Sequence, residues 1–369
     1  MDARSVLVLN AGSSSLKWVV LDSETEAIRQ HGDTSWPVNE AGRHEREMAA
    51  ALQQVDSADA VGHRVVHGGE HFRDAVLIDE GVREQIAELA DLAPLHNPAA
   101  VAGIDAVRSR FPNVPQVAAF DTAFHATLPD VASTYPLPWD WTARWGLRRF
   151  GFHGLSVSYA ATRVRELLGA LPSRLVVCHL GAGCSVTAVA DGKSIDTSMG
   201  FTPLEGLMMA KRSGSVDPGL LVYLLERQGV TSTELDTALN EQSGLLGVSG
   251  VSADMREVLS AAGAGNDRAR LARDLFVRRI VTTIGGMLPP LGGLDALVFT
   301  GGIGEHSGLI RAGVCSAFGF IGLSLDGAVN QATVKDGEIS QAGSAVRVLV
   351  ITAREDLAIL RQVRRVLGW

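Results

Sequence analysis

Residues 5–22 read SVLVLNAGSSSLKWVVLD, two short apolar runs separated by a turn of asparagine, glycine and three serines. Small turn residues allow the backbone to approach a ligand closely, and hydroxyls and backbone N–H groups can bind phosphate oxygens. Lys17 adds a positive charge at the edge of this turn. The GxxxxGK[ST] pattern of a P-loop is absent, and the second apolar run continues as a strand. The stretch therefore indicates a phosphate-binding hairpin, with an ordinary serine-rich turn as the alternative.

A second copy of this pattern occurs later in the chain. Residues 175–191, LVVCHLGAGCSVTAVAD, can be overlaid on the first stretch so that His179 falls on Asn10 and Gly181 on Gly12. A phosphate hairpin in each half of one chain predicts a two-lobed nucleotide site with the phosphates held between the lobes. That architecture resembles the actin, hexokinase and 70-kDa chaperone superfamily.

Length and charge narrow the class of protein further. A chain of 369 residues exceeds what one core usually serves, so we expect two domains. The net charge of −8 argues against nucleic acid or an anionic membrane as a partner. We find no signal peptide and no apolar run long enough to span a membrane, and we expect a cytoplasmic protein. Three scattered cysteines without a C-x-x-C pair predict reduced thiols rather than a disulfide framework or a zinc site.

Two charged residues stand at the ends of predicted strands. Arg64 lies within AVGHRVVHGG at 60–69, and an arginine in an apolar strand that ends in two glycines is expected to point into a site. Asp121 follows the apolar run at 117–120, where ligands collect in open α/β sheets. The alternatives are a structural ion pair for Arg64 and a turn or helix-capping role for Asp121.

The remaining elements are expected as follows. Residues 43–55 form a surface helix within the otherwise weakly patterned segment 24–60, and residues 197–219 form a long functional loop. A long helix runs over 267–287 and ends at two prolines. A buried strand leads into a GGxGE turn over 296–305.

Several motifs together resemble the acetate kinase family, also called the acetokinases. They are VLVLNAGSSSLKW at 6–18 and VAAFDTAFHATLP at 117–129, followed in the expected order by RRFGFHG, GFTPLEGLMM and FTGGIGE. The match extends from Val6 to about Leu360. The resemblance implies an α/β, two-lobed, duplicated ribonuclease-H-like fold with a nucleotide cleft between the lobes. It also implies reversible transfer of the γ-phosphoryl group from ATP to acetate.

The same resemblance implies roles for individual residues. Catalytic roles fall on Arg64, Asp121, His153, Arg212 and His96. Nucleotide-binding roles fall on Lys17, His179, Leu180, Gly181, Ala182, Gly183, Asp254, Met255, Arg256, Gly301, Gly302, Ile303, Gly304 and Glu305. The pocket for the acyl group is formed by Val66, Leu95, Phe152 and Pro203, and the metal site by Asn10 and Glu355.

The resemblance also implies an organisation and a set of ligands. Residues 1–148 form the lobe for the acyl substrate and phosphate, completed by a C-terminal helix over 353–369. Residues 149–352 form the nucleotide-binding lobe, which also carries the dimer interface. The expected ligands are acetate, ATP or ADP, and Mg²⁺, for which Mn²⁺ can substitute, and the expected assembly is a homodimer.

The chain departs from the family pattern at a few positions near these residues. Ala182 replaces an amide, Lys211 and Ser215 are substituted within the loop, and Arg354 alters the segment before the last helix. The alternatives are therefore a propionate or butyrate kinase, which differs in pocket volume, and a nucleotide-binding regulatory homologue without turnover. For an active enzyme we expect direct in-line transfer, because an acetate carboxylate with a pKa near ~4 is already ionised and no residue is singled out as a nucleophile.

Overall fold

The computed structural model describes residues 4–12, 15–35, 43–93, 96–333 and 335–369, with only the backbone of 43–45. It divides into two compact units. The first unit consists of Met1–Ala126, His153–Tyr159 and Arg354–Trp369, and the second of Thr127–Phe152 and Ala160–Ala353. This division differs from the boundary expected at residue 148, because the chain passes between the units at more than one point.

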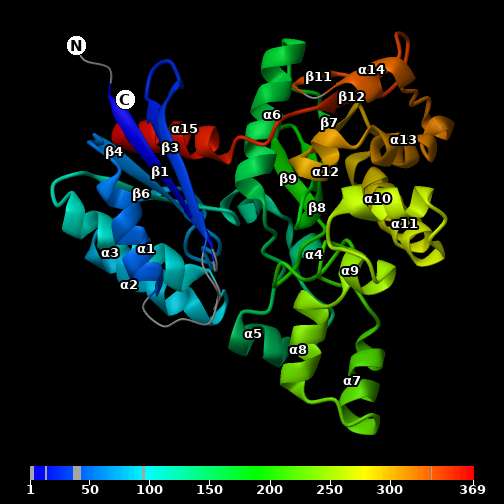
Figure 1. Cartoon of the computed structure of the whole chain (residues 1–369), viewed down its shortest axis with the longest axis horizontal. Coiled ribbons are helices and arrows are strands. Elements are labelled where there is room, and N and C mark those ends of the chain that lie inside the picture. Colours follow the sequence, from blue (N-terminus) through cyan, green and yellow to red (C-terminus); the bar gives the residue numbers. More distant parts are fainter. Residues whose placement is uncertain (1–3, 13–14, 36–42, 94–95, 334) are drawn as a thin grey trace. The chain divides into compact units, whose positions relative to one another are not determined.

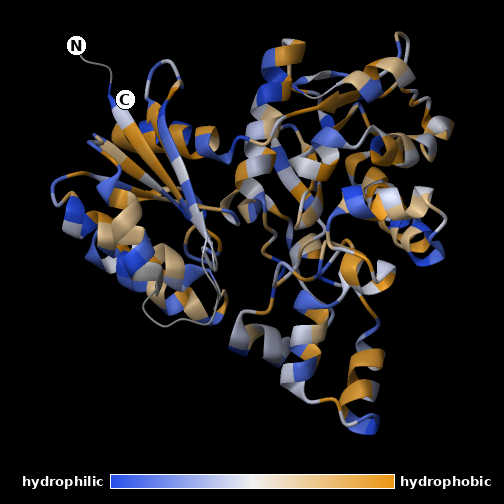
Figure 2. Cartoon of the chain, viewed as in Figure 1, coloured by the Kyte–Doolittle hydropathy of each residue, from blue (hydrophilic) through white to orange (hydrophobic). Residues whose placement is uncertain are grey.

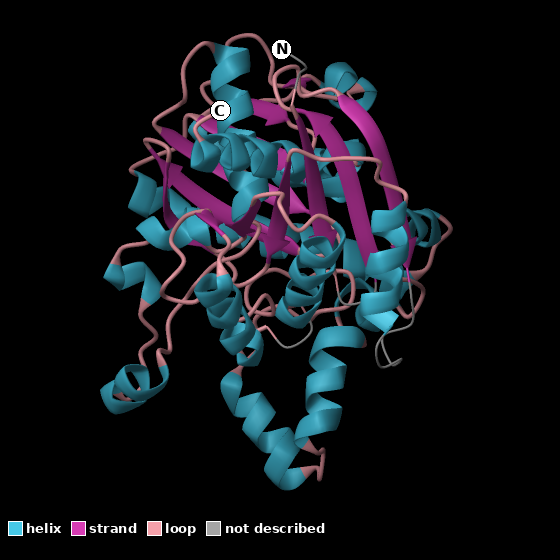
Figure 3. Cartoon of the chain, turned by 90° about the vertical axis from the view of Figure 1, so that its left-hand side faces the viewer, coloured by secondary structure: helices cyan, strands magenta, loops and turns pink. Residues whose placement is uncertain are grey.

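Each unit is built on a mixed six-stranded sheet. The strands of the first sheet are β1 (Ser5–Ala11), β2 (Ser15–Asp22), β3 (Ile28–Ser35), β4 (Ala60–Val65), β5 (Val76–Leu77) and β6 (Gln116–Phe120). The strands of the second sheet are β7 (Arg174–Leu180), β8 (Cys184–Ala190), β9 (Lys193–Thr197), β10 (Ala296–Thr300), β11 (Gly337–Glu338) and β12 (Arg347–Val350). Figure 3 shows these strands in magenta with helices packed against them.

The two sheets have the same topology. The first has the order β3-β2-β1-β4-β6-β5, and the second has the corresponding order β9-β8-β7-β10-β12-β11. In both, three antiparallel strands are followed by two parallel ones and an antiparallel edge strand. The predicted α/β class and the internal duplication are therefore confirmed.

The two predicted hairpins open this repeated unit in both sheets. In the first hairpin Ala11 pairs with Leu16, and in the second Leu180 pairs with Cys184. The first turn is consequently one residue longer than the second, so the ungapped overlay of the two sequences holds on the first strand of each hairpin and shifts by one residue on the next.

Helices connect these strands along the chain. They are α1 (Arg43–Gln53), α2 (Glu80–Glu88), α3 (Asn97–Arg110), α4 (Asp130–Ser133), α5 (Trp139–Trp145), α6 (Gly154–Leu168), α7 (Pro218–Arg227), α8 (Ser232–Glu241), α9 (Gly244–Ser249), α10 (Met255–Gly263), α11 (Asp267–Leu291), α12 (Gly301–His306), α13 (Gly308–Ser316), α14 (Gly327–Ala332) and α15 (Glu355–Leu367). None of the described helices combines the length and the apolar character that a membrane crossing requires.

The first sheet is covered on both faces, which explains why β1 is almost continuously apolar. Leu7 and Leu9 pack in one core with Met48 of α1 and Val107 of α3. The opposite face is covered by α15, which packs against β1, β4 and β6 (Figure 1). A β-carbon at Gly62 would overlap side chains of α15, so glycine is required for this close approach.

Two expectations about secondary structure need correction, and one strand was not predicted. The weakly patterned segment 24–60 contains β3, an edge strand without a continuous apolar face. The GGxGE sequence forms the short helix α12 rather than a turn. The long helix α11 does not end at Pro289 and Pro290 but continues to Leu291, where Gly292 takes a left-handed conformation with φ of 69°. Both prolines therefore lie inside the last turn of the helix.

Candidate active site

The site in the first unit is centred on the guanidinium group of Arg64. Its Nη1 donates to Oδ1 of Asn10 over 3.1 Å, and its Nη2 forms an ion pair with Asp121. Its Nε lies 3.6 Å from Oε2 of Glu355. The structure therefore brings together four of the predicted site residues from distant parts of the sequence.

The topology of the sheet explains why these residues meet. Asn10, Arg64 and Asp121 lie at or just beyond the carboxyl ends of the neighbouring parallel strands β1, β4 and β6. Arg64 shares a face of β4 with Gly62, the glycine that α15 approaches, and Glu355 is the first residue of α15. The predicted position at the carboxyl edge of the sheet follows directly from this arrangement.

Lys17 belongs to the same edge. It pairs directly with Asn10 across β1 and β2, so the two side chains leave the same face of the sheet. Lys17 is exposed whereas its neighbours Leu16 and Trp18 are buried. The cation is thus available to a ligand beside Asn10. Ser13 and Ser14 lie outside the described residues.

Arg64 remains charged in this setting. Burial acts to lower the pKa of Arg64, but the charges of Asp121 and Glu355 outweigh it and hold the pKa above its usual range. The side chain of Asp121 is only 1% exposed, whereas Arg64 is 17% exposed. The guanidinium group therefore compensates a buried carboxylate and still reaches the surface of the site.

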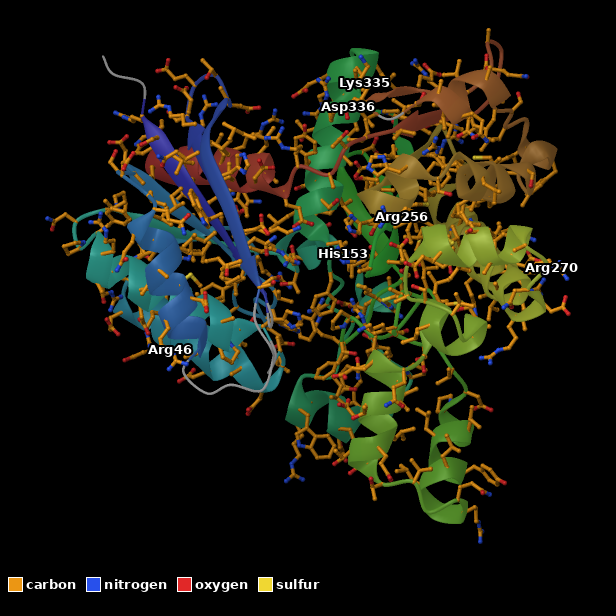
Figure 4. The ribbon with its side chains drawn as sticks, viewed as in Figure 1. Arg46, His153, Arg256, Arg270, Lys335 and Asp336 are labelled. Carbon is orange, nitrogen blue, oxygen red and sulfur yellow. The ribbon has the colours of Figure 1, made fainter. Side chains whose placement is uncertain are left out.

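His153 adjoins Asp121 through the backbone. The N–H of Gly154 donates to the carbonyl oxygen of Asp121 over 2.8 Å, and a β-carbon at Gly154 would overlap that oxygen. His153 itself has a φ of 60°, in the left-handed region that residues other than glycine rarely adopt. Backbone strain of this kind concentrates at functional sites, and here it lies at His153, immediately before α6 (Figure 4).

The segments that contain His96 and Val66 are joined by buried hydrogen bonds between the side chain of Asn97 and the backbone of His67. The amide of Asn97 accepts from the N–H of His67 over 3.2 Å and donates to the carbonyl of His67 over 3.1 Å. This link joins the start of α3, where His96 is the N-cap, to the segment after β4 that contains Val66. Leu95 lies outside the described residues.

The second unit contains a cavity of about 830 Å³ at the carboxyl ends of β7 and β10. Several predicted nucleotide-binding residues line it, together with one predicted catalytic residue: Gly181, Ala182, Arg212, Asp254, Met255, Arg256, Gly302 and Ile303. They come from the turn after β7, the loop between β9 and α7, the start of α10 and the helix α12. The duplicated topology thus places a ligand-sized space at the same edge of the second sheet.

The other predicted nucleotide-binding residues of the second unit are neighbours in the sequence of residues that line this cavity. His179, Leu180, Gly183, Gly301, Gly304 and Glu305 are not among its lining residues. Gly301 has a φ of 77°, and a β-carbon there would overlap the backbone of Leu180. The carboxylate of Glu305 accepts from the N–H of Gly301 over 2.9 Å. These contacts fix the point where β10 passes directly into α12.

A charged pair lies at the N-terminus of α10. Asp254 caps the helix by accepting from the N–H of Arg256 over 2.8 Å. Arg256 also donates from its side chain to Asp254 and thereby lowers the pKa of that carboxyl group to about 2. The side chain of Arg256 is 90% exposed, so its guanidinium group reaches solvent although it is paired with Asp254 (Figure 4).

Sequence patterns missed part of the lining of the cavity. The additional lining residues are Ala210, Lys211, Asn240, Ala253, Leu259, His306 and Ser307. Ala210 and Lys211 immediately precede Arg212, so their position in the loop was a usable signal. Asn240 lies on the surface helix α8, where nothing in the local sequence distinguishes it.

A half-buried polar network, also missed, holds the long irregular loop that carries Arg212. Glu205 accepts from Arg149 over 2.8 Å and from the hydroxyl of Tyr135. That hydroxyl accepts from the N–H of Phe201 over 2.8 Å, and burial together with Glu205 raises the pKa of Tyr135. The network fixes the start of the loop near its attachment to the sheet.

Arg212 itself lies toward the end of this loop. Its Nη1 donates to the carbonyl oxygen of Pro203 over 2.5 Å, and burial lowers its pKa. Pro203 and Phe152 belong to the second unit and Val66 to the first. Because these residues belong to different units, the acyl pocket that they are predicted to form remains a prediction.

The comparisons with known proteins agree with this geometry. The sequence profile of the acetokinase family matches residues 39–361. The chain belongs to the acetokinase family. An acetate kinase of Nostoc punctiforme is 53% identical to this family member over 86% of the chain and 78% of the relative. The crystal structure of an acetate kinase from Porphyromonas gingivalis is 37% identical with a TM-score of 0.91, and covers 99% of this chain and 100% of its own. A propionate kinase from Francisella tularensis is 36% identical with a TM-score of 0.88, over 97% and 98% of the two chains.

The donor set around Arg64 in this acetokinase family member fits a magnesium ion. Asn10 and Glu355 present an amide and a carboxylate oxygen, the ligand type that Mg²⁺ prefers. Among the described residues, no group of three or more His, Cys, Asp or Glu side chains could enclose a metal.

Proposed function

We propose that the chain acts as an acetate kinase, transferring the γ-phosphoryl group of ATP reversibly to acetate to give acetyl phosphate and ADP. The observation that carries the proposal is the shared guanidinium group of Arg64, which joins Asn10, Asp121 and Glu355 at one sheet edge. Membership of the acetokinase family and the cavity in the second unit support it. In this proposal the first unit binds the acyl substrate, and the second binds the nucleotide.

Direct in-line transfer suits the residues present. Acetate is ionised at neutral pH because its pKa lies near ~4, so its oxygen can attack phosphorus without a strong base. Phosphoryl transfer then depends on alignment and on positive charge around the equatorial oxygens. Arg64, Arg212 and the protonatable side chain of His153 are proposed to provide that charge. Asp121, already paired with Arg64, orients the guanidinium group and is not required as a proton acceptor.

Asn10 and Glu355 are the residues proposed to hold Mg²⁺, and Mn²⁺ offers the same preference for oxygen ligands. When bound, the ion neutralises charge on the phosphate oxygens. The protein itself holds the side chains of Asn10 and Glu355 in place, because both contact Arg64.

The acid preferred is part of the proposal. Acetate is placed first because Val66, Phe152 and Pro203 are proposed to close a small acyl pocket. The similarity to a propionate kinase makes propionate the natural second substrate. Formation of acyl hydroxamate from acetate, propionate and butyrate with ATP and Mg²⁺ tests the proposal directly. Turnover with none of the three would refute it and favour a regulatory nucleotide-binding homologue.

We further propose that the chain forms a homodimer through the second unit. Helix α7 has no buried residues, and it exposes Leu220, Val222 and Tyr223 by 46%, 51% and 51% (Figure 2). A contiguous apolar surface of this kind favours association. Light scattering after size exclusion should give twice the chain mass, and Val222→Glu with Tyr223→Glu should give the monomer. A monomeric wild-type chain would refute the proposal.

A further inference from the structure

Two carboxylates hold the segment that leads into α15. The N–H of Thr352 donates to Oδ1 of Asp336 over 2.8 Å, and the N–H of Ala353 donates to Oε1 of Glu305 over 2.9 Å. Ala353 is the last residue of the second unit, and Arg354 begins the closing part of the first. The segment is therefore fixed from the second unit immediately before the chain passes to the first.

Each carboxylate is anchored at a second point. The same Oε1 of Glu305 accepts from the N–H of Gly301 over 2.9 Å, at the start of α12. The carbonyl oxygens of Gly304 and Glu305 accept from the buried side chain of Arg311 over 2.8 and 2.6 Å. Asp336, labelled in Figure 4, accepts from Nε of Arg163 on α6 over 2.6 Å.

Helix α12 is also a wall of the proposed nucleotide cavity, to which it contributes Gly302 and Ile303. Glu305 is 7% exposed and is not a lining residue. Its carboxylate thus connects the start of α12, a helix that lines the cavity, to a backbone N–H only two residues before Glu355. Glu355 in turn approaches Arg64.

We propose that Glu305 is a positioning residue that couples occupancy of the nucleotide cavity to the placement of Glu355. A ligand that orders Gly302 and Ile303 fixes the Gly301 N–H, and through the shared oxygen of Glu305 it restrains Ala353 and the start of α15. The inference rests on the proposed function in taking a nucleotide as the ligand of the cavity.

Three variants separate this role from a general structural one. Glu305→Gln keeps an oxygen acceptor for both N–H groups, whereas Glu305→Ala leaves both donors without it. Asp295→Ala is the matched control, because Asp295 also accepts a backbone N–H, from Arg174 over 3.0 Å, but precedes β10 at the opposite end of the sheet.

Hydrogen exchange of the peptide covering residues 350–358 provides a readout that does not depend on turnover. We expect ADP to slow exchange of this peptide about fivefold or more in the wild type, in Glu305→Gln and in Asp295→Ala. In Glu305→Ala we expect ADP to bind with a Kd within about threefold of wild type, measured by calorimetry, but to give no protection of this peptide. We also expect kcat to fall by about tenfold or more, because small misplacements of a reacting group are costly.

The inference is overturned if ADP protects this peptide equally in Glu305→Ala, if ADP gives no protection in the wild type, or if the alanine variant loses ADP binding outright. Should Glu305→Ala fail to fold, Glu305→Asp replaces it, since the shorter carboxylate cannot span both donors; protection retained in that variant overturns the inference. Protection that depends on Glu305 in a chain that forms no acyl phosphate would refute the proposed function alone. Turnover without such protection would refute the coupling alone.

Discussion

Replacing Arg64 by alanine should damage both stability and catalysis, and a second substitution should separate the two effects. The side chain of Asp121 is 1% exposed and paired with Arg64, so Arg64→Ala leaves a buried carboxylate without its countercharge. Breaking such a pair typically costs about 3–5 kcal/mol in the free energy of unfolding. Loss of a charge that stabilises a transition state costs about 3 kcal/mol in activation, or about 10²-fold in kcat/KM.

The double variant Arg64→Ala, Asp121→Asn removes the uncompensated charge. We expect it to regain most of the lost stability in urea unfolding while kcat/KM in the hydroxamate assay stays at least about 10²-fold below wild type. Arg83→Ala is the matched control, because the Arg83–Asp105 pair lies in the same unit with side chains 27% and 43% exposed. This control should lose less than about 1 kcal/mol and retain its activity.

If the double variant regains activity together with stability, Arg64 serves only to neutralise Asp121. If Arg64→Ala alone keeps kcat/KM within about threefold of wild type, Arg64 does not contact the transferring phosphoryl group, because the loss would lie far below the cost expected for such a contact.

Three further outcomes are expected. Arg212→Ala should lower kcat/KM by about 10²-fold with little change in melting temperature, and near-normal turnover would remove Arg212 from the site. Burial lowers the pKa of His63 to about 4, below the ~6.5 of an unfolded chain, so the unfolded state binds the extra proton and stability should fall by up to about 3 kcal/mol from pH 6.5 to pH 4. His63→Leu should flatten that slope, and an unchanged slope would show that other groups cause it. Acetate and propionate should lie within about tenfold of each other in kcat/KM, and butyrate at least about tenfold lower, because overpacking offsets the ~0.8 kcal/mol gained for each methylene. Val66→Ala should narrow these differences, and an unaltered ranking would place the acid elsewhere.

The sequence predicted the part of the site that follows from local rules. Each hairpin is a local pattern, and the position of Asp121 after a buried strand is a local signal for the carboxyl edge of a sheet. The convergence of Arg64 with Asn10 then follows from the parallel pairing of β4 with β1.

What the sequence could not reveal depends on partners far along the chain. Glu305 follows a glycine-rich stretch and was grouped with the nucleotide-binding residues, yet its carboxylate accepts an N–H from a residue 48 positions away. Glu205 and Tyr135 form a hydrogen bond across 70 positions, and neither residue type marks such a network. The end of α11 was also misjudged, because Pro289 and Pro290 were expected to end the helix but lie inside its last turn.

The position of α15 has a consequence for biosynthesis. This helix is translated after residues 160–353, but it covers β4 and brings Glu355 to a cluster whose other members precede residue 122. A ribosome must therefore complete the whole second unit before α15 can cover the second face of the first sheet. Until then the nascent chain presents an apolar sheet face to chaperones, and a stop codon between residues 160 and 353 would yield an uncovered sheet rather than a half-active fragment.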